Sequence, residues 1–395
     1  MKLNDIAYFV EDKISSENIK LDQYVTTDSL LQNKKGRTFA QNLPPQKCSL
    51  VHFKKGDVLL GNIRPYLKKI WYANIEGGCS QDVLVLRAKN NLESKFLYAL
   101  LMQDSFFDYE MKATKGSKMP RGDKSHIINF PCLDLNNKTE IGKLLSSLDD
   151  KIALNNRINA KLEQMAKRLY DYWFVQFDFP NADGKPYKST GGKMVWNEEL
   201  KREIPDGWEV GNLYDIAEYV NGLACQNYRP KESEKSLPVI KIREMNEGIT
   251  ADTEKVSASI PGKYRIYAGD ILFSWSASLE IKIWTGETGG LNQHIFKVIP
   301  KGYFSKGYVY QQLSAYLVNF QKMAESRKTT MGHITSDHIK QSRILIPLKE
   351  IISAFNEKTF SIFNYQLSIE KETQKLTALR DRLLPLLMNG QVVVE

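Results

Sequence analysis

The sequence has few cysteines and histidines, and this scarcity excludes several classes of protein. The four cysteines are Cys48, Cys79, Cys132 and Cys225, and no two of them form a CxxC pair. A disulfide framework and a zinc ribbon are therefore not indicated, and we expect thiols in a reducing cytoplasm. The five histidines include no HExxH arrangement, so the sequence predicts no metal site.

Long apolar runs are also missing. No stretch approaches the roughly 18 consecutive apolar residues of a transmembrane helix. The first residues, MKLNDIAYFVEDK, contain no apolar signal core. We therefore expect a soluble, cytoplasmic protein that has no membrane partner.

Motifs of DNA-modifying and nucleotide-hydrolysing enzymes are absent as well. The segment 42–46 has an inserted leucine and lacks the aromatic residue of the Pro-Pro-aromatic methyltransferase motif, and no GxGxxG follows a strand pattern. The GGK sequence at 191–193 lacks the spacing of a P-loop, and Glu93 and Lys95 lack the upstream acidic partner of a nuclease site. The sequence therefore predicts a non-catalytic chain that binds no cofactor itself.

Length and charge suit a two-domain protein with a polyanionic partner. The 395 residues exceed what one ordinary core supports, so two domains are expected. Lys and Arg number 55 against 46 Asp and Glu, which gives a formal charge of +9. This excess favours a nucleic acid as partner but does not require one.

The most informative feature is an internal duplication, in which residues recur in the same order about 210 to 214 positions later. The repeated residues are Leu3, Asp5, Ile6, Ala7 and Val10 with Leu213, Asp215, Ile216, Ala217 and Val220; Gly56, Asp57 and Leu59 with Gly269, Asp270 and Leu272; Gly77, Gly78 and Gln81 with Gly289, Gly290 and Gln293; Met119, His126 and Ile127 with Met331, His338 and Ile339; and Lys161, Leu162, Arg168 and Leu169 with Lys375, Leu376, Arg382 and Leu383. A period this long is not that of a solenoid. It predicts two copies of a domain, each followed by a helix and related by an internal pseudo-twofold.

Each copy ends in a helical pattern whose seam residues alternate at spacings of four and three, which is typical of a coiled coil. The first seam runs from Leu148 to Trp173, and the second runs from Ile352 to Leu387. Pro385 is expected to kink or end the second helix. At ~1.5 Å per residue a helix of about 37 residues spans ~55 Å, against ~34 Å per turn of B-DNA, so such helices could act as a spacer.

We expect the two seams to pair with each other in antiparallel fashion, because a long narrow apolar stripe is best covered by another such stripe. The alternative is that each helix packs separately. Asn155, Asn159 and Gln366 are polar seam residues, and we hypothesise that they set the register of the pair.

Three segments carry a resemblance to a known family. They are LLSSLDDKIALNNRINAKLEQMAKRLYDYWFVQFDFP, GKPYKSTGGKMV and IPDGWEVGNLYDIA. They closely resemble the central conserved region of the specificity subunits of type I restriction-modification enzymes. The family's order of recognition domain, helix, recognition domain and helix also matches the whole chain. No counterpart of Ile204, Pro205, Gly207 and Trp208 precedes the first copy.

The resemblance implies a subunit that reads a bipartite target in double-stranded DNA. It also implies that the subunit docks two modification (methyltransferase) subunits and that restriction (motor-nuclease) subunits join them. S-adenosylmethionine, ATP and Mg are then expected on those partner subunits. The exposed helix residues Lys151, Arg157, Lys161 and Arg168 are candidate docking contacts.

Together these features predict an α+β fold. We expect two pseudo-twofold-related target-recognition domains, each a twisted sheet with helices, joined by two long antiparallel coiled-coil helices. The expected segments are 1–138 for the first recognition domain, 139–180 for the central spacer helix, 181–348 for a linker and the second recognition domain, and 349–395 for the distal spacer helix.

Residues for reading DNA are sought among long cations, which reach phosphates, and among amides, hydroxyls and Arg, which read base edges. In the first domain KATKGSKMPRGDK combines such residues with glycine and proline, which let the backbone approach a duplex. The candidates there are Lys112, Lys115, Ser117, Lys118, Arg121 and Lys124, with Arg64, Tyr66, Lys68 and Gln81 elsewhere in the domain. For Arg64, Tyr66 and Lys68 a solvated surface explains the sequence equally well, and for Gln81 a structural turn does.

In the second domain the corresponding segment is SRKTTMGHIT. The candidates are Arg327, Lys328, Thr329, Thr330 and His333, with Tyr228, Arg229, Arg243 and Asn246 elsewhere. For the last four a solvated surface is again an equal explanation. Trp275 and the repeated His126 and His338 are expected to be structural.

Two other functions remain open. A self-sufficient DNA-modifying enzyme requires a catalytic motif, and we find none in the sequence. An interaction protein that binds modification subunits without reading DNA would be favoured by acidic loops, and the loops named above are basic.

Overall fold

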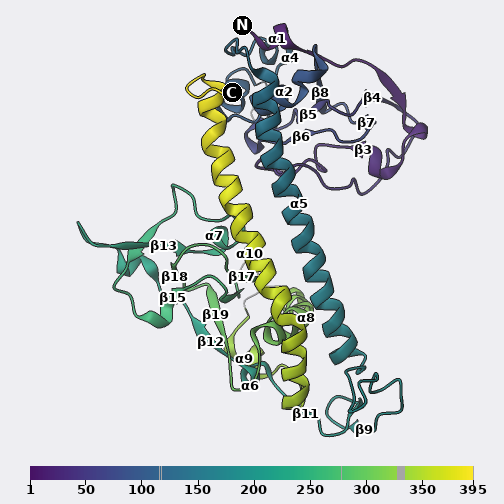
Figure 1. The fold of residues 1–395 in the computed structure, drawn as a ribbon, viewed down its shortest axis with the longest axis vertical. Coiled ribbons are helices and arrows are strands. Elements are labelled where there is room, and N and C mark those ends of the chain that lie inside the picture. Colours follow the sequence, from purple (N-terminus) through teal and green to yellow (C-terminus); the bar gives the residue numbers. More distant parts are fainter. Residues whose placement is uncertain (115, 117, 277, 327–333, 395) are drawn as a thin grey trace. The chain divides into compact units, whose positions relative to one another are not determined.

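The computed structural model describes residues 1–114, 116, 118–276, 278–326 and 334–394. Its contacts divide the chain into two compact units: unit 1, Met1–Leu154 with Gln374–Glu395, and unit 2, Asn155–Thr373. The two long helices α5 (Lys138–Tyr170) and α10 (Lys349–Met388) each contribute one part to either unit (Figure 1). The expected boundaries treat these helices as separate segments, whereas the contacts divide each helix between the two units.

Unit 1 contains two four-stranded sheets with helices packed against them. The first sheet has the order β1 (Ala7–Phe9), β8 (Val83–Ala88), β5 (Val58–Gly61) and β6 (Ile70–Tyr72), and the second has the order β2 (Lys13–Ser15), β4 (Ser49–Phe53), β7 (Gly77–Cys79) and β3 (Tyr24–Val25). The helices are α1 (Leu3–Ile6), α2 (Ser94–Leu101), α3 (Asp104–Met111) and α4 (Lys124–Ile127). Apolar faces of the first sheet, of these helices and of both long helices form the main core of the unit.

Unit 2 repeats this plan with additions. The first sheet has the order β12 (Ala217–Asn221), β19 (Ile295–Pro300), β16 (Ile271–Ser274) and β17 (Glu280–Ile283), and the second has the order β14 (Lys255–Ser257), β13 (Ser236–Ile240), β18 (Gly289–Leu291) and β15 (Arg265–Ile266). Two-stranded sheets join β9 (Met194–Asn197) to β10 (Arg202–Pro205) and β11 (Glu209–Gly211) to β20 (Ile344–Ile346). The other helices are α6 (Leu213–Ile216), α7 (Ile242–Glu247), α8 (Lys306–Ser326) and α9 (Ser336–Lys340).

The duplication found in the sequence is a duplication of structure. β1-β8-β5-β6 and β12-β19-β16-β17 have the same strand order and are antiparallel throughout. Asp5 and Asp215 each accept the backbone N–H three residues earlier, at 2.7 Å in both cases, and so cap equivalent helices. The prediction of two copies of one α+β domain is therefore confirmed.

The second sheets share three strands and differ in the fourth. In both units the central strand, β7 or β18, pairs parallel with β3 or β13 and antiparallel with β4 or β15. The fourth strand is β2 beside β4 in unit 1, but β14 beside β13 in unit 2. The extra strand therefore joins opposite edges of the shared three-stranded sheet in the two units.

The repeated glycines lie in these central strands because neighbouring atoms approach closely there. A Cβ added to Gly77 would lie 2.1 Å from the backbone oxygen of Gln23, and one added to Gly289 would lie 2.5 Å from Ile240 Cγ1. Such distances leave no room for a side chain. The glycines that precede Gln81 and Gln293 thus have a packing role, while Gln81 and Gln293 themselves lie in the turns that follow.

We expect the Gly77→Ala substitution to destabilise the protein by about 1–3 kcal/mol, because the methyl group would force β7 away from β3. Gly262→Ala is a suitable control, since nothing lies within 4 Å of its added Cβ. It should change the stability by less than about 0.5 kcal/mol. Urea denaturation of the full chain measures both effects. Equal stability of the two variants would contradict the packing role of Gly77.

The long helices pair with each other within each unit. In unit 1 Arg380 Nη1 donates to Asp149 Oδ1 at 2.9 Å, and Leu145 shares a core with Leu384 and Leu387. In unit 2 Asn155 Nδ2 donates to Glu372 Oε2 at 2.8 Å and Asn159 Nδ2 to Glu370 Oε2 at 3.2 Å. Residue numbers rise along α5 while those of its partners on α10 fall, so the predicted antiparallel pairing is confirmed.

The polar seam is only partly satisfied by hydrogen bonds. Asn155 is 1% exposed, yet within the described residues its Oδ1 has no partner, and neither has Asn159 Oδ1 or Gln366 Oε1. A buried acceptor without a partner costs about 1–3 kcal/mol, so these amides do not explain the stability of the pair. That they set its register stays a hypothesis.

The ends of both helices differ from simple expectation. α5 passes into a π-helical turn, Asp171–Val175, before the chain turns away. Pro385 was expected to kink or end the helix; α10 runs past it and ends at Met388, so the helix does not end at the proline. Proline is tolerated in this last turn because Leu387 and Met388 are buried in the core of unit 1 and hold the backbone helical.

The cysteines carry free thiols, two of them buried. Burial raises the pKa of the Cys79 thiol to about 12 and that of Cys225 to about 11, which makes both unreactive. In the part of the chain that the structure describes, three or more His, Cys, Asp or Glu side chains nowhere gather as metal ligands. None of its described helices is long and apolar enough to cross a membrane.

Candidate nucleic-acid interface

Three loops of unit 1 are hydrogen-bonded into one surface, residues 62–69, 80–82 and 118–123, which we call loop edge 1. Asn62 N–H donates to the backbone oxygen of Asp82 at 2.9 Å, and Arg64 N–H donates to that of Pro120 at 2.8 Å. Ile63 and Arg121 form an isolated antiparallel bridge. The structure therefore brings Arg64, Gln81 and Arg121, which the sequence predicts separately, onto one edge of the unit.

The backbone of loop edge 1 is strained at two of the predicted DNA-binding residues. Arg64 and Lys68 have φ angles of 54° and 50°, a left-handed conformation that residues other than glycine rarely adopt. Each such residue costs about 1–3 kcal/mol. The bond from Arg64 N–H to Pro120 and one from Lys68 N–H to the Pro65 oxygen, 2.8 Å, hold the strained turn in place. A strained, well-fixed loop of this kind is typical of a functional surface.

The predicted side chains of this edge fall into two groups. Arg64 and Gln81 are exposed, as is Tyr66 at 50%, and none of the three side chains has a hydrogen bond or ion pair among the residues described. Lys68 Nζ instead lies 2.7 Å from Asp104 Oδ1, and Arg121 Nη2 lies 3.1 Å from Asp82 Oδ1. Because exposed ion pairs are worth at most about 1 kcal/mol, a phosphate could still take up either cation.

The remaining candidates of unit 1 flank the same edge. Lys112 and Lys118 are exposed in the segment that follows α3. Lys124 begins α4, and its Nζ lies 5.5 Å from the centre of the Phe9 ring. Lys115 and Ser117 lie outside the described residues.

A buried carboxyl group lies directly under loop edge 1. Glu110 of α3 is 1% exposed, and its Oε1 has no partner among the described residues. The same holds for Asn62 Oδ1, and a Cβ added to Gly122 would lie 2.4 Å from the first oxygen and 2.9 Å from the second. Burial raises the pKa of Glu110 to about 8, so the group is mostly protonated at neutral pH.

Glu110 was not among the functional residues predicted from the sequence. The available signal is its position three and four residues after Phe107 and Phe106, which places an acid on the apolar face of α3. As a neutral acid it supplies one O–H donor to a site that otherwise holds two acceptors. Glu110 thus lies, mostly neutral, beneath the loop that carries Arg121.

We expect the stability of unit 1 to fall as pH rises from about 4.5 to 8. The folded protein keeps a proton on Glu110 that the unfolded chain releases above about pH 4.5, the ordinary pKa of the group. Stability then decreases by up to about 1.4 kcal/mol per pH unit in this window. Glu110→Gln stays neutral, so it should be more stable than the native chain at pH 8 and close to it at pH 5.

Thermal denaturation at pH 5, 6.5 and 8 measures this difference. Glu11→Gln, at an exposed position of the same unit, is the control and should follow the native profile. A Glu110→Gln protein with the native pH profile would show that Glu110 is not the group responsible.

Unit 2 has an equivalent loop edge, formed by residues 275–276, 292–294 and 334, which we call loop edge 2. Trp275 N–H donates to the backbone oxygen of His294 at 3.3 Å, as Asn62 does to Asp82, and Ile334 N–H donates to that of Trp275 at 3.0 Å, as Gly122 does to Asn62 at 3.2 Å. The Trp275 ring is half-buried against the main core, and His294 is exposed beside it. Arg327, Lys328, Thr329, Thr330 and His333 lie outside the described residues.

The repeated histidines are structural, as expected. His126 stacks on Tyr109 with ring centres 4.0 Å apart, and its Nε2 lies 3.1 Å from the Tyr109 backbone oxygen. His338 is buried, and its Nδ1 accepts the Thr335 N–H at 2.9 Å.

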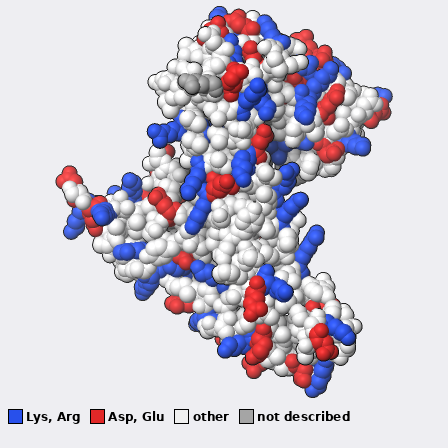
Figure 2. All heavy atoms as spheres, viewed as in Figure 1, with Lys and Arg blue, Asp and Glu red and all other residues white. Residues whose placement is uncertain are grey.

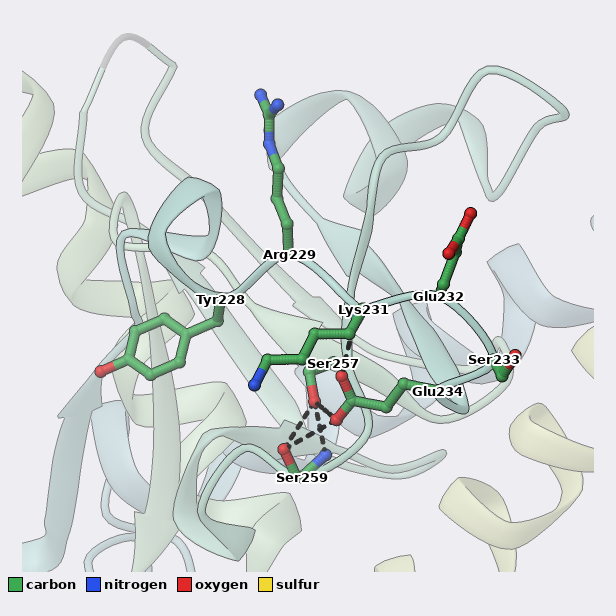
Figure 3. Close-up of a pocket in the computed structure, with 8 residues that line it drawn as sticks. All are labelled: Tyr228, Arg229, Lys231, Glu232, Ser233, Glu234, Ser257 and Ser259. Carbon is green, nitrogen blue, oxygen red and sulfur yellow. Dashed lines mark hydrogen bonds between the residues drawn. The ribbon is translucent and has the colours of Figure 1, made fainter.

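Tyr228 and Arg229 lie beside strands β13 and β14, at a shallow hollow of about 480 Å³. Glu234 accepts hydrogen bonds there from the Ser257 hydroxyl and, at 3.0 Å each, from Ser259 Oγ and Lys231 N–H. These bonds, that of Ser257 above all, lower the pKa of Glu234. In Figure 3 Tyr228 and Arg229 point away from this cluster, so both are free to meet a ligand outside the hollow.

Arg243 and Asn246 belong to α7, and the structure gives Arg243 an internal role. Its Nε and Nη2 both donate to Oε1 of the buried Glu244, at 2.9 and 2.6 Å. The hydrogen bond to Glu244 raises the pKa of Arg243 and keeps Glu244 from being a buried charge without a partner. Asn246 is half-buried, and its Oδ1 has no partner in the described part of the chain.

Comparison with known proteins places this geometry in a family. The family model described as type I restriction modification DNA specificity domain matches residues 1–164 and 205–379. The chain is 26% identical over 436 residues to the specificity subunit of the type I restriction enzyme HindI of Haemophilus influenzae, covering 93% of this chain and 94% of that one. It is 25% identical over 363 residues to the MjaIX specificity subunit of Methanocaldococcus jannaschii, covering 89% and 81%.

A solved structure shows the same fold. The type I restriction-modification S subunit of M. genitalium superposes with a TM-score of 0.58 at 14% identity and covers 97% of this chain and 94% of its own. Since the family model matches both copies of the duplication and well over half of the sequence, this chain belongs to the family of type I restriction-modification DNA specificity domains.

Proposed function

We propose that this chain is the DNA-reading, non-catalytic subunit of a type I restriction-modification enzyme, and that each unit reads one half of a bipartite target. The observation that carries the proposal is the duplicated loop edge. The same backbone hydrogen bonds join the same three loops in both units, at positions about 212 residues apart, within a chain of that family.

The exposed side chains on and beside loop edge 1 suit two kinds of DNA contact, one with phosphates and one with base edges. Lys112, Lys118 and Lys124 are exposed cations that would neutralise phosphates and position the domain. Arg64 and Gln81 carry the groups that pair with base edges, since Arg pairs with guanine and Gln pairs with adenine. Because neither side chain is engaged within the described structure, binding to a base would break no internal bond.

Partners supply the chemistry that this chain lacks. The proposed assembly has two modification subunits, which hold S-adenosylmethionine, and restriction subunits, which hold ATP and Mg. Lys151, Arg157, Lys161 and Arg168 are all exposed on α5, which supports their proposed role as docking contacts. Such an assembly would act on DNA in the cytoplasm.

The alternative, an interaction protein that does not read DNA, is not favoured. It predicts acidic or featureless loops, whereas five exposed cations, Arg64, Lys112, Lys118, Arg121 and Lys124, lie on or beside loop edge 1. It also gives no reason for the strained backbone at Arg64.

We expect substitution of Lys118 by Gln to weaken DNA binding uniformly across sequences. Loss of one phosphate contact lowers the slope of log affinity against log salt by about 0.9. Lys185→Gln, an exposed lysine of unit 2 outside its loop edge, is the matched control and should leave the slope unchanged. Fluorescence anisotropy with duplex DNA at several salt concentrations measures both slopes, and equal slopes would remove Lys118 from the interface.

The decisive test is co-expression with the neighbouring methyltransferase subunit in a host without DNA methylation, followed by mapping of modified adenines. We expect two short half-sites separated by a fixed unspecified spacer, with one adenine modified on each strand. A stable complex that leaves the DNA unmodified would overturn the proposal and favour the interaction protein.

A further inference from the structure

The fold gives a packing or hydrogen-bonding reason for several of the residues that are repeated in the two units. The repeated glycines of β7 and β18 lie too close to neighbouring atoms to carry a side chain. Asp57 and Asp270 each accept the N–H of the residue three positions earlier, Lys54 at 2.7 Å and Tyr267 at 2.9 Å. These repeated residues, like His126 and His338 above, are explained by the fold.

Gln81 and Gln293 have no such explanation. They occupy the turns that follow β7 and β18, and backbone bonds hold both turns: Val83 N–H to Ser80 oxygen at 3.0 Å, and Ile295 N–H to Asn292 oxygen at 3.0 Å. The Gln81 side chain is exposed and forms no hydrogen bond within the described residues. In the same part of the chain, the Gln293 side chain has one hydrogen-bonding contact, between its Nε2 and Nε2 of the neighbouring His294 at 3.3 Å. Many polar residues could fill either position without affecting the turn.

Both glutamines lie within the loop edges. The residue after Gln81, Asp82, accepts the Asn62 N–H, and the residue after Gln293, His294, accepts the Trp275 N–H. Each glutamine therefore directly precedes the residue that forms the same backbone bond in its unit. A free carboxamide offers one acceptor and two donors, which match N6 and N7 of adenine in the major groove.

We propose that Gln81 and Gln293 are corresponding specificity-determining residues, each reading an adenine in the half-site of its own unit. This inference rests on the proposed function and adds to it the corresponding residue Gln293 and an adenine shared by the two half-sites. The surrounding elements differ between the units, since β2 and β14 join opposite edges of the second sheets. The two half-sites should thus differ in their other bases and share an adenine at the position where these turns meet the DNA.

The test uses the full complex of this chain with its modification subunits and the target found by methylome mapping. Each adenine of the two half-sites is replaced singly by 7-deazaadenine, which lacks the N7 acceptor. For the native complex one replacement in each half-site should weaken binding by about 5- to 150-fold. Gln81→Ala should abolish the effect in one half-site only, and Gln293→Ala in the other only.

Controls separate the possible outcomes. Gln391→Ala, at an exposed glutamine beyond α10, should bind like the native chain. An equal loss of affinity for all sequences after Gln81→Ala would identify a phosphate contact and overturn the inference, as would native binding by both variants. A native complex with no preference for its mapped target would instead overturn the proposed function itself.

Discussion

The antiparallel pairing of α5 and α10 is the interaction on which the rest of the molecule depends. It brings the last residues of the chain back to unit 1, where Leu384, Leu387 and Met388 complete a core built mainly from the first 145 residues. In unit 2 Phe355 of α10 packs against Trp173 and Phe174 in the same way. Neither core is complete without both long helices, so each end of a long helix is fixed in the core of one unit.

Apolar burial stabilises this pair, and its polar groups are hypothesised to set the register of the helices. Burial raises the pKa of Asp149 in spite of the hydrogen bond from Arg380, so this ion pair is costly to desolvate and costly to break. A shift of one turn would separate Asp149, Asn155 and Asn159 from their present partners on α10. Polar seam residues of this kind lower stability but penalise wrong registers.

Much of the fold could be predicted from the sequence because its signals are local or repeated. The seam residues from Leu148 to Trp173 are all buried or half-buried, as their spacing predicts. The fourth strand of the second sheet could not be predicted, because β2 and β14 each have three residues and their pairing is decided by tertiary contacts. The end of α10 at Met388 could not be predicted for a similar reason, because the burial of Leu387 and Met388 in the core of unit 1 outweighs the cost of Pro385.

The candidate site was predictable in composition but not in geometry. A basic, glycine-containing loop indicates Lys118 and Arg121, but only the fold shows that Arg64 and Gln81 lie beside them and that Arg243 is bound to Glu244. The duplication shows that the same backbone framework holds both loop edges, whose side chains differ. A loop edge fixed by backbone hydrogen bonds tolerates changes in its side chains, because the bonds that hold it do not depend on them. Under the proposed function, one scaffold can thereby read two different half-sites. The long helices, which complete both cores, join the two units in one chain.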